Sequence, residues 1–415
     1  MTRSLKIITV HAADHGGGAE RSVLTLHRAL RAMGHDSTLY VGYCNLDEPH
    51  VHAVQRTRPF PGCLGAVRAI ERATGLQDLY APGLRKLLGN LPKDVDLVHL
   101  HSLWGSGHYA DVGAIAMAAA RFPTVLTLRD EWMLTGHCAC SHGCQRWRIG
   151  CGKCPDLTVP PAVTRDATRF NFLRKRYVVQ RSKLHVTTVS HALRRQAEQS
   201  PIMTGKPITV IHNGIDLEAF CPGDQHQARR KLGLPGDGLM VLMAGQTIEG
   251  INQGVAQQAA AALNALQDPR ITPLLVGHSA AKVAATLSVP CRVLPFQDKP
   301  GTMANCYRAA DLTLVSSEVE TFGRIAAESQ ACGTPVITSD AGGLPEVVRD
   351  GLGGRVVPNR CIEGFVQALC ELTHDPELRR RMGTAGVQWV RCQFADEHIT
   401  KQYLKLYGTL VSMDA

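Results

Sequence analysis

The stretch that decides the fold reads SSEVETFGRIAAESQACGTPVITSDAGGLPE and runs from Ser316 to Glu346. It is entered from a short apolar run, Asp311–Ser317, that is typical of a buried strand. From Gly323 the apolar residues fit one helix, which ends near Gly333. A second buried strand is expected at Thr334–Ser339. The pattern of strand, loop, helix and strand predicts an α/β crossover.

Two carboxylates eight positions apart, Glu320 and Glu328, bracket the start of this helix. Glu328 is expected roughly 7–8 Å further along the helix axis. The first-turn N–H groups near Phe322, Gly323 and Arg324 attract anions, because they have no partners within the helix and the helix dipole is positive there. An anion site flanked by carboxylates suits a nucleotide diphosphate sugar, whose ribose hydroxyls a carboxylate can accept. The alternative is an ordinary helix with an acidic first turn, which the dipole alone favours.

The stretch resembles the E-x7-E region of family-4 retaining glycosyltransferases, and the resemblance extends over most of the chain. It implies the α/β GT-B fold, in which two doubly wound Rossmann-like domains face each other across a cleft. In that family the first Glu contacts the transferred sugar and the second contacts the ribose. Carried over by motif, these residues are Glu320 and Glu328, with Phe322, Gly323 and Arg324 at the donor phosphates.

Length and composition agree with a two-domain protein. The chain has 415 residues, of which 44% are hydrophobic and 20% charged. No apolar run approaches the ~20 residues that span a bilayer, and the N-terminus lacks the features of a signal peptide, so a cytoplasmic location is expected. The net charge of +9 suits a phosphate-bearing substrate or an anionic membrane surface. No nucleic-acid motif accompanies the basic residues, which disfavours a nucleic-acid partner.

The expected domains are an N-terminal acceptor-side domain over residues 1–203, with a Cys-rich insertion at 131–160, and a nucleotide-sugar-binding domain over 204–390. Ser200–Pro207 is interpreted as the linker. Residues 391–415 resemble the family's terminal helix, which returns to the first domain.

The first domain opens with a strand at Leu5–Val10, a glycine loop and a helix, as a nucleotide-binding half does. Gly17 and Gly18 resemble the family's Gly-Gly loop beside the donor phosphate, although a plain tight turn is the alternative. Further strands at Asp96–Ser102 and Thr124–Asp130 bring polar residues to the edge where parallel sheets bind ligands. Candidate catalytic residues in this domain are therefore His101, Arg129 and Asp130, which join Glu320 of the second domain. The alternative is that they are satisfied polar groups at strand ends, and family relatives often carry His-Asp where this chain has Arg-Asp.

The insertion reads EWMLTGHCACSHGCQRWRIGCGKCP and carries five cysteines. The best-spaced metal ligands are four of them: Cys138, Cys144, Cys151 and Cys154. Four thiolates form a closed tetrahedral structural zinc site, with Cys140, His137 and His142 as spare ligands. Unligated thiols are the alternative. Certain bacterial exopolysaccharide glycosyltransferases carry a similar insertion.

Two further segments bear on the ligands. Residues 163–183 predict a basic helix whose apolar side is either core or a face for an anionic membrane. In the second domain Gln246 and Glu249 stand where family members usually place an Arg and a Lys that neutralise the pyrophosphate, and Gln246 is counted among the donor-binding candidates. The charge must then come from elsewhere, with Arg324, Arg21 and Arg129 as candidates. A segment at Gly351–Pro358 is expected to form a hairpin-like piece.

Taken together, the residues and the resemblance predict a metal-independent hexosyltransferase that acts with retention. The donor is expected to be a UDP- or GDP-sugar, and the acceptor a polysaccharide intermediate or an aminocyclitol-like natural product. The chain's Asp-x-Asp triplet, Asp94-Val95-Asp96, is not interpreted as a metal-binding motif of the metal-dependent type. The alternative is a non-catalytic or epimerase-type GT-B protein that binds nucleotide sugars.

Overall fold

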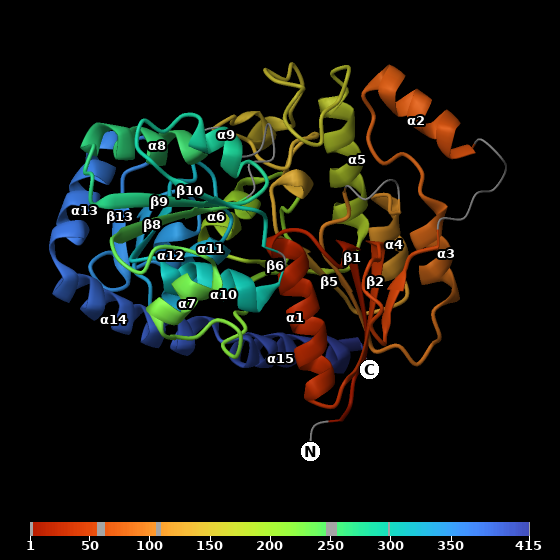
Figure 1. Cartoon of the computed structure of the whole chain (residues 1–415). Helices are drawn as coiled ribbons and strands as arrows, with labels where there is room; N and C mark the ends of the chain where they lie inside the picture. Colours follow the sequence, from red (N-terminus) through yellow and green to blue (C-terminus); the bar gives the residue numbers. More distant parts are fainter. Residues whose placement is uncertain (1–2, 56–62, 105–108, 246–254, 298, 415) are drawn as a thin grey trace. The chain divides into compact units, whose positions relative to one another are not determined.

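The computed structural model describes residues 3–55, 63–104, 109–245, 255–297 and 299–414. The chain divides into two compact units (Figure 1). Unit 1 comprises Met1–His212 and Ile399–Ala415, and unit 2 comprises Asn213–His398. Among the described residues, every helix is too short or too polar to cross a bilayer.

The sheet of unit 1 has seven strands in the order β3-β2-β1-β4-β5-β6-β7, and every neighbouring pair is parallel. The strand order reverses between β1 and β4, which makes their carboxyl ends a topological switch point. The strands are β1 (Lys6–Ala13), β2 (Asp36–Tyr43), β3 (Val51–Ala53), β4 (Leu97–Leu100), β5 (Thr124–Leu128), β6 (His185–Thr188) and β7 (Ile208–Val210).

Helices cover this sheet on both faces. On one face the apolar sides of α1 and α15 pack together on β1, β4 and β5. Elsewhere in the unit α4 packs against α3 and α5. The helical segments are α1 (Gly18–Ala32), α2 (Cys63–Thr74), α3 (Pro82–Asn90), α4 (Gly113–Ala119), η1 (Trp132–Leu134), η2 (Arg146–Ile149), α5 (Thr168–Arg181), α6 (His191–Gln199) and α15 (Asp396–Asp414).

The sheet of unit 2 has six parallel strands in the order β10-β9-β8-β11-β12-β13, and its order reverses between β8 and β11. Figure 1 shows α8 and α9 on one side of it and α7, α10 and α14 on the other. The strands are β8 (Leu239–Ala244), β9 (Ile271–Val276), β10 (Arg292–Leu294), β11 (Leu312–Val315), β12 (Val336–Ser339) and β13 (Gly354–Val357). The helices are α7 (Gln225–Lys231), α8 (Val255–Leu266), α9 (Ala280–Ala284), α10 (Pro300–Ala309), α11 (Arg324–Ala331), α12 (Leu344–Val347), α13 (Ile362–His374) and α14 (Pro376–Phe394).

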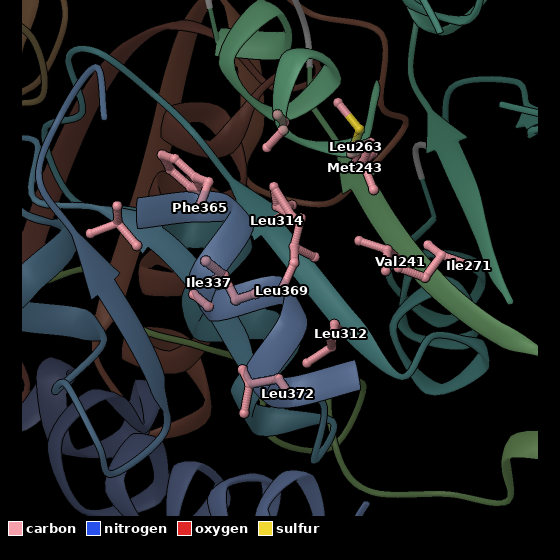
Figure 2. Close-up of a cluster of buried hydrophobic side chains, with 14 of the residues drawn as sticks. Val241, Met243, Leu263, Ile271, Leu312, Leu314, Ile337, Phe365, Leu369 and Leu372 are labelled. Atoms are coloured by element: carbon pink, nitrogen blue, oxygen red, sulfur yellow. The ribbon is translucent and has the colours of Figure 1, made fainter. Parts of the chain in front are cut away.

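The core of unit 2 lies where α8 and α13 pack on the sheet (Figure 2). Phe365, Leu369 and Leu372 on α13 are all fully buried against the strands. Their spacing of three to four residues places them on one helix face. The strand side chains they meet, such as Leu312 and Ile337, belong to continuous apolar runs, as expected for parallel strands covered on both faces.

The observed boundaries differ from the expected ones at two points. The sheet of unit 1 continues through β7, because Ile208–Val210 pairs with β6, so the chain leaves this unit after His212 rather than after residue 203. The chain returns to unit 1 at Ile399 rather than at residue 391. Helix α14 still belongs to unit 2 and ends at Phe394, and the return falls three residues after α15 starts at Asp396.

The expected hairpin at Gly351–Pro358 was wrong. Residues Gly354–Val357 form β13, which pairs parallel with β12 and extends the sheet. A glycine at 354 permits this, because a Cβ there would lie 1.8 Å from the carbonyl oxygen of Val336. The pairing of β13 with β12 therefore depends on a close approach of two backbones. The glycines of this segment indicate a turn in the sequence and give no sign of that approach.

Replacing Tyr407 with Phe tests how α15 is held to unit 1. The Tyr407 hydroxyl lies 2.6 Å from Nδ1 of His99, and both side chains are buried. We expect a loss of about 1–3 kcal/mol in the free energy of unfolding, because the substitution leaves a buried ring nitrogen without a partner. Urea denaturation measures this loss.

Tyr403→Phe is the matched control, since the Tyr403 hydroxyl lies 3.4 Å from Oγ1 of Thr127 and makes a weaker contact. Equal losses for the two variants would contradict the importance of the His99 contact.

Candidate functional site

The predicted strand, loop, helix and strand around the two glutamates is present in unit 2 as β11, α11 and β12. Gly323 is the N-cap of α11, with φ of +103° and ψ of +50°. This left-handed conformation favours glycine. A Cβ at Gly323 would also lie 2.7 Å from Cδ2 of Leu344. The helix start is therefore set by a residue without a side chain.

Glu320 lies on the loop just before α11 and is partly buried. Its Oε1 accepts a hydrogen bond from the N–H of Phe322 at 3.4 Å. Burial raises the pKa of Glu320, and the backbone N–H groups of residues 321–323 offset part of that rise. The carboxylate is thus held beside the first turn of the helix.

A glycine pair holds the backbone of this loop in place. The N–H of Gly343 donates to the carbonyl of Glu320 at 2.9 Å. A Cβ at Gly342 would lie 1.9 Å from that same oxygen, and Gly342 has φ of +54°. The loops after β11 and β12 therefore meet so closely that only glycine fits between them.

Glu328 lies inside α11 and is 2% exposed. Its Oε1 accepts from Nε of Arg324 at 2.6 Å, and its Oε2 accepts from the hydroxyl of Tyr307 at 3.0 Å. Arg324 also donates through Nη1 to the carbonyl of Gly214 at 3.2 Å. The predicted ribose ligand is thus part of an internal network, although each carboxylate oxygen keeps a second acceptor position.

Of the two side chains expected at the pyrophosphate beside β8, neither is described, because Gln246 and Glu249 lie outside the described residues. Arg324, the first residue of α11, is the candidate cation that the structure places at the predicted anion site.

In unit 1 the glycine loop forms the start of α1. Gly16 has φ of +122°, and Gly17 is the N-cap. The N–H of Gly17 donates to Oε2 of Glu20 at 2.9 Å, which is one half of a capping box, and Gly18 begins the helix. The other carboxylate oxygen of Glu20 lies 3.7 Å from Nε2 of His11. The loop has the expected shape, and its contact with a donor stays a prediction.

The structure brings the predicted residues His101 and Arg129 together at the carboxyl ends of β4 and β5. Nε of Arg129 donates to Nδ1 of His101 at 3.2 Å, and both side chains are buried. The ring of His101 lies 3.9 Å from that of His99 between centroids, with the two planes tilted by 40°, and 5.9 Å from the ring of His11. Burial lowers the pKa of His101 well below its ordinary value, with His99, Arg129 and His11 adding to the effect.

A neutral His101 that accepts at Nδ1 carries its proton on Nε2. Among the described residues, this buried Nε2 has no hydrogen-bond partner. Sequence reasoning missed His11 and His99. The alternation of His99 with His101 along one strand was the available signal, since residues two apart share a face.

Asp130 turns away from this cluster. One of its oxygens accepts from Nε1 of Trp104 at 2.8 Å and from the hydroxyl of Ser102 at 3.2 Å. The other accepts from the N–H of Trp132 at 2.8 Å. Burial raises the pKa of Asp130, which these donors partly offset. In this structure Asp130 ties the loops after β4 and β5 together, and its catalytic role stays a prediction.

All four predicted metal ligands line one small cavity of about 20 Å³ in the insertion of unit 1, namely Cys138, Cys144, Cys151 and Cys154. His137 lines it as well, whereas the spare candidates Cys140 and His142 do not. Burial raises the pKa of Cys138 to about 12 and that of Cys151 to about 11.

Both halves of the chain match models of glycosyltransferase families. Residues 16–219 match the family model described as Glycosyltransferase Family 4. Residues 224–389 match the model described as Glycosyl transferases group 1.

Curated relatives carry one recurring name. The D-inositol 3-phosphate glycosyltransferase of Kribbella flavida is 35% identical over 196 residues, covering 44% of this chain and 46% of the relative. That of Actinosynnema mirum is 36% identical over 217 residues, covering 48% and 51%. The chain thus spans about half the length of these curated relatives.

Solved structures show the same fold over the whole chain. Sucrose-phosphate synthase from Thermosynechococcus elongatus has a TM-score of 0.72 at 19% identity, covering 99% of this chain and 100% of that protein. HepE from Anabaena, in complex with UDP and glucose, has a TM-score of 0.69 at 18% identity, covering 97% and 99%. At these identities the likeness shows the fold alone, and it confirms the predicted α/β GT-B architecture. With the two family models on consecutive stretches, the chain belongs to the group 1, family 4 glycosyltransferases of the GT-B fold.

Proposed function

We propose that this protein transfers a sugar from a nucleoside diphosphate sugar to an acceptor hydroxyl, with retention at the anomeric carbon. The observation that carries the proposal is the arrangement around α11. Glu320 lies beside the first turn of the helix, and Arg324 and Glu328 form a buried pair within it. Family membership supports the same reaction class.

The donor is a UDP- or GDP-sugar, and the first choice is UDP. Support comes from the structural neighbour HepE, whose structures contain UDP and UDP-glucose. For the acceptor, the relatives named D-inositol 3-phosphate glycosyltransferase favour a ring polyol over a polysaccharide intermediate. Such an acceptor agrees with the aminocyclitol-like class expected from the sequence.

In the proposed mechanism Glu320 accepts hydrogen bonds from hydroxyls of the transferred sugar. The start of α11 and Arg324 stabilise the negative charge that grows on the departing pyrophosphate. The leaving phosphate takes the proton of the acceptor hydroxyl, so no side-chain base is required. His101 in unit 1 offers a buried Nε2–H donor for a substrate hydroxyl or phosphate.

The protein also contacts an anionic membrane surface peripherally in this proposal. Along α5 the side chains of Phe170, Leu173 and Tyr177 are 53%, 43% and 60% exposed. The helix and its flanks are rich in arginine. Exposed apolar and basic side chains on one helix suit an anionic lipid surface.

The second candidate function is a non-catalytic or epimerase-type protein that binds nucleotide sugars. It is motivated by Gln246 and Glu249, which replace the cationic pair usual in relatives. A panel of nucleotide sugars, each incubated with and without inositol phosphates and aminocyclitols, separates the two functions. Acceptor-dependent release of nucleoside diphosphate supports the transferase. Nucleotide binding without release, or conversion of the donor alone, supports the second candidate.

Glu320→Gln tests the sugar contact. We expect kcat/KM to fall about 10²-fold, because a charged acceptor that faces the reacting sugar is lost, while UDP still binds. Steady-state release of nucleoside diphosphate measures the rate, and calorimetry measures UDP affinity.

Glu318→Gln is the matched control. Glu318 lies two positions before Glu320 and forms an ion pair with the exposed Arg360. A Glu320 variant as active as this control would contradict the assignment.

Glu328→Ala tests the ribose contact. We expect UDP affinity to fall about tenfold or more, as for the loss of a hydrogen bond to a charged group. The free energy of unfolding also falls by about 3–5 kcal/mol, because the largely buried guanidinium of Arg324 loses the carboxylate that balances its charge. Calorimetry at a temperature where the variant is folded measures UDP binding, and urea denaturation measures stability.

Tyr307→Phe serves as the control, because it removes one donor to Glu328 and keeps the carboxylate. If folded Glu328→Ala binds UDP as tightly as this control, the ribose assignment is wrong.

A further inference from the structure

The insertion of unit 1 forms a cavity with an unusual set of metal-binding groups. Four thiols and one imidazole line it, although they are spread over eighteen positions of the chain, from His137 to Cys154. Thiolate and imidazole are the ligands that Zn²⁺ prefers, and four of them complete a closed tetrahedral site.

The backbone around Cys151 is left-handed over four consecutive residues. Gly150, Cys151, Gly152 and Lys153 all have positive φ, with values of 58° at Cys151 and 50° at Lys153. Non-glycine residues in this region cost about 1–3 kcal/mol each and persist only where other contacts hold them. The N–H of Gly136 donates to Sγ of Cys151 at 3.2 Å, which is the kind of bond that stabilises a thiolate ligand.

His137 supplies a second, independent observation. It is 1% exposed, and its Nε2 lies 3.2 Å from the carbonyl oxygen of Asp156 and 3.7 Å from Sγ of Cys154. Among the described residues its Nδ1, which is also buried, has no hydrogen-bond partner. A buried imidazole nitrogen without a partner is costly, so the polar lining next to the four thiols is not satisfied by the described residues alone, and His137 stays a spare ligand.

The cavity is fixed to the rest of unit 1 at its base. Nζ of the buried Lys175 donates to the carbonyls of Trp132 at 2.6 Å and Thr135 at 3.2 Å. The N–H of Gly152 donates to Oγ1 of Thr168 at 3.0 Å, and that of Cys154 to Oδ2 of Asp166 at 2.8 Å. The insertion is therefore bound to α5 and to the residues just before it.

We propose that this cavity binds one structural Zn²⁺ through Cys138, Cys144, Cys151 and Cys154, and that the ion locks the insertion onto α5. In the part of the chain that the structure describes, no three of the cavity's ligand atoms lie within 4.8 Å of one another. Binding therefore draws the sulfurs inward, and each thiol releases its proton to the solvent as its bond to the ion forms. The site is distinct from the proposed sugar-transfer residues, so either proposal can fail alone.

Elemental analysis of the full chain, purified under reducing conditions, tests the site. We expect about one zinc per chain in the wild type. Cys144→Ser and Cys151→Ser are expected to lose it. Cys140→Ser is the matched control, since Cys140 is buried in the same insertion and does not line the cavity. A wild-type chain that carries no zinc after growth in zinc-supplemented medium, or an equal loss in Cys140→Ser, overturns the proposal.

A second measurement needs no variant and so does not depend on their folding. The wild-type chain is stripped with a chelator and titrated with Co²⁺. Visible absorption of tetrahedral cobalt thiolate at one equivalent supports the site, and its absence overturns it. Limited proteolysis of the stripped chain is expected to cut within residues 135–156 faster than before stripping. Unchanged cleavage would contradict the locking role.

Discussion

Every strand pair in both sheets is parallel, and this constraint decides where polar chemistry can gather in the chain. Parallel strands present their carboxyl ends at one edge, and the loops diverge where the strand order reverses. In unit 1 that point lies between β1 and β4, and His11 and His101 lie there. In unit 2 it lies between β8 and β11, and the loop that carries Glu320 follows β11. In each unit the strand order therefore determines at which edge of the sheet polar side chains can gather.

At the edge of unit 2, backbone contacts position the loop more than side chains do. Gly323 caps α11 in a left-handed conformation, and Gly342 and Gly343 touch the backbone of Glu320. Larger residues at these glycines would push the loops after β11 and β12 apart. The carboxylate of Glu320 is consequently placed by two neighbouring turns that have little conformational freedom.

Much of this arrangement could be predicted from the sequence, because its signals are local. The apolar runs at Asp311–Ser317 and Thr334–Ser339 mark β11 and β12, and the spacing of Glu320 and Glu328 marks the helix between them. The contacts of Glu328 could not be predicted in the same way. Tyr307 reaches it from α10, twenty-one positions upstream, and no local pattern reports that contact.

Contacts between distant segments also explain the other features that the sequence did not predict. His99 bonds to Tyr407, which lies 308 positions along the chain, and β13 depends on the close approach of Gly354 to Val336. The extent of unit 1 depends on the pairing of β7 with β6. Such features arise from packing between distant segments, whereas the four cysteines of the insertion were found because their spacing is itself the signal.

The electrostatics of α11 differ from those of a simple cationic phosphate site. Arg324 and Glu328 form a buried pair, so together they contribute no net charge. Arg324 begins the helix and Glu328 lies one turn further along, so the positive end of the pair is at the same end as the positive end of the helix dipole. Dipoles fixed in a buried setting need no reorganisation when charge develops beside them. On the proposed function, this aligned set stabilises the leaving pyrophosphate as its charge grows and adds less to binding of the intact donor. If the proposed function holds, a neutral pair at the helix start supports the chemical step more than it tightens substrate binding.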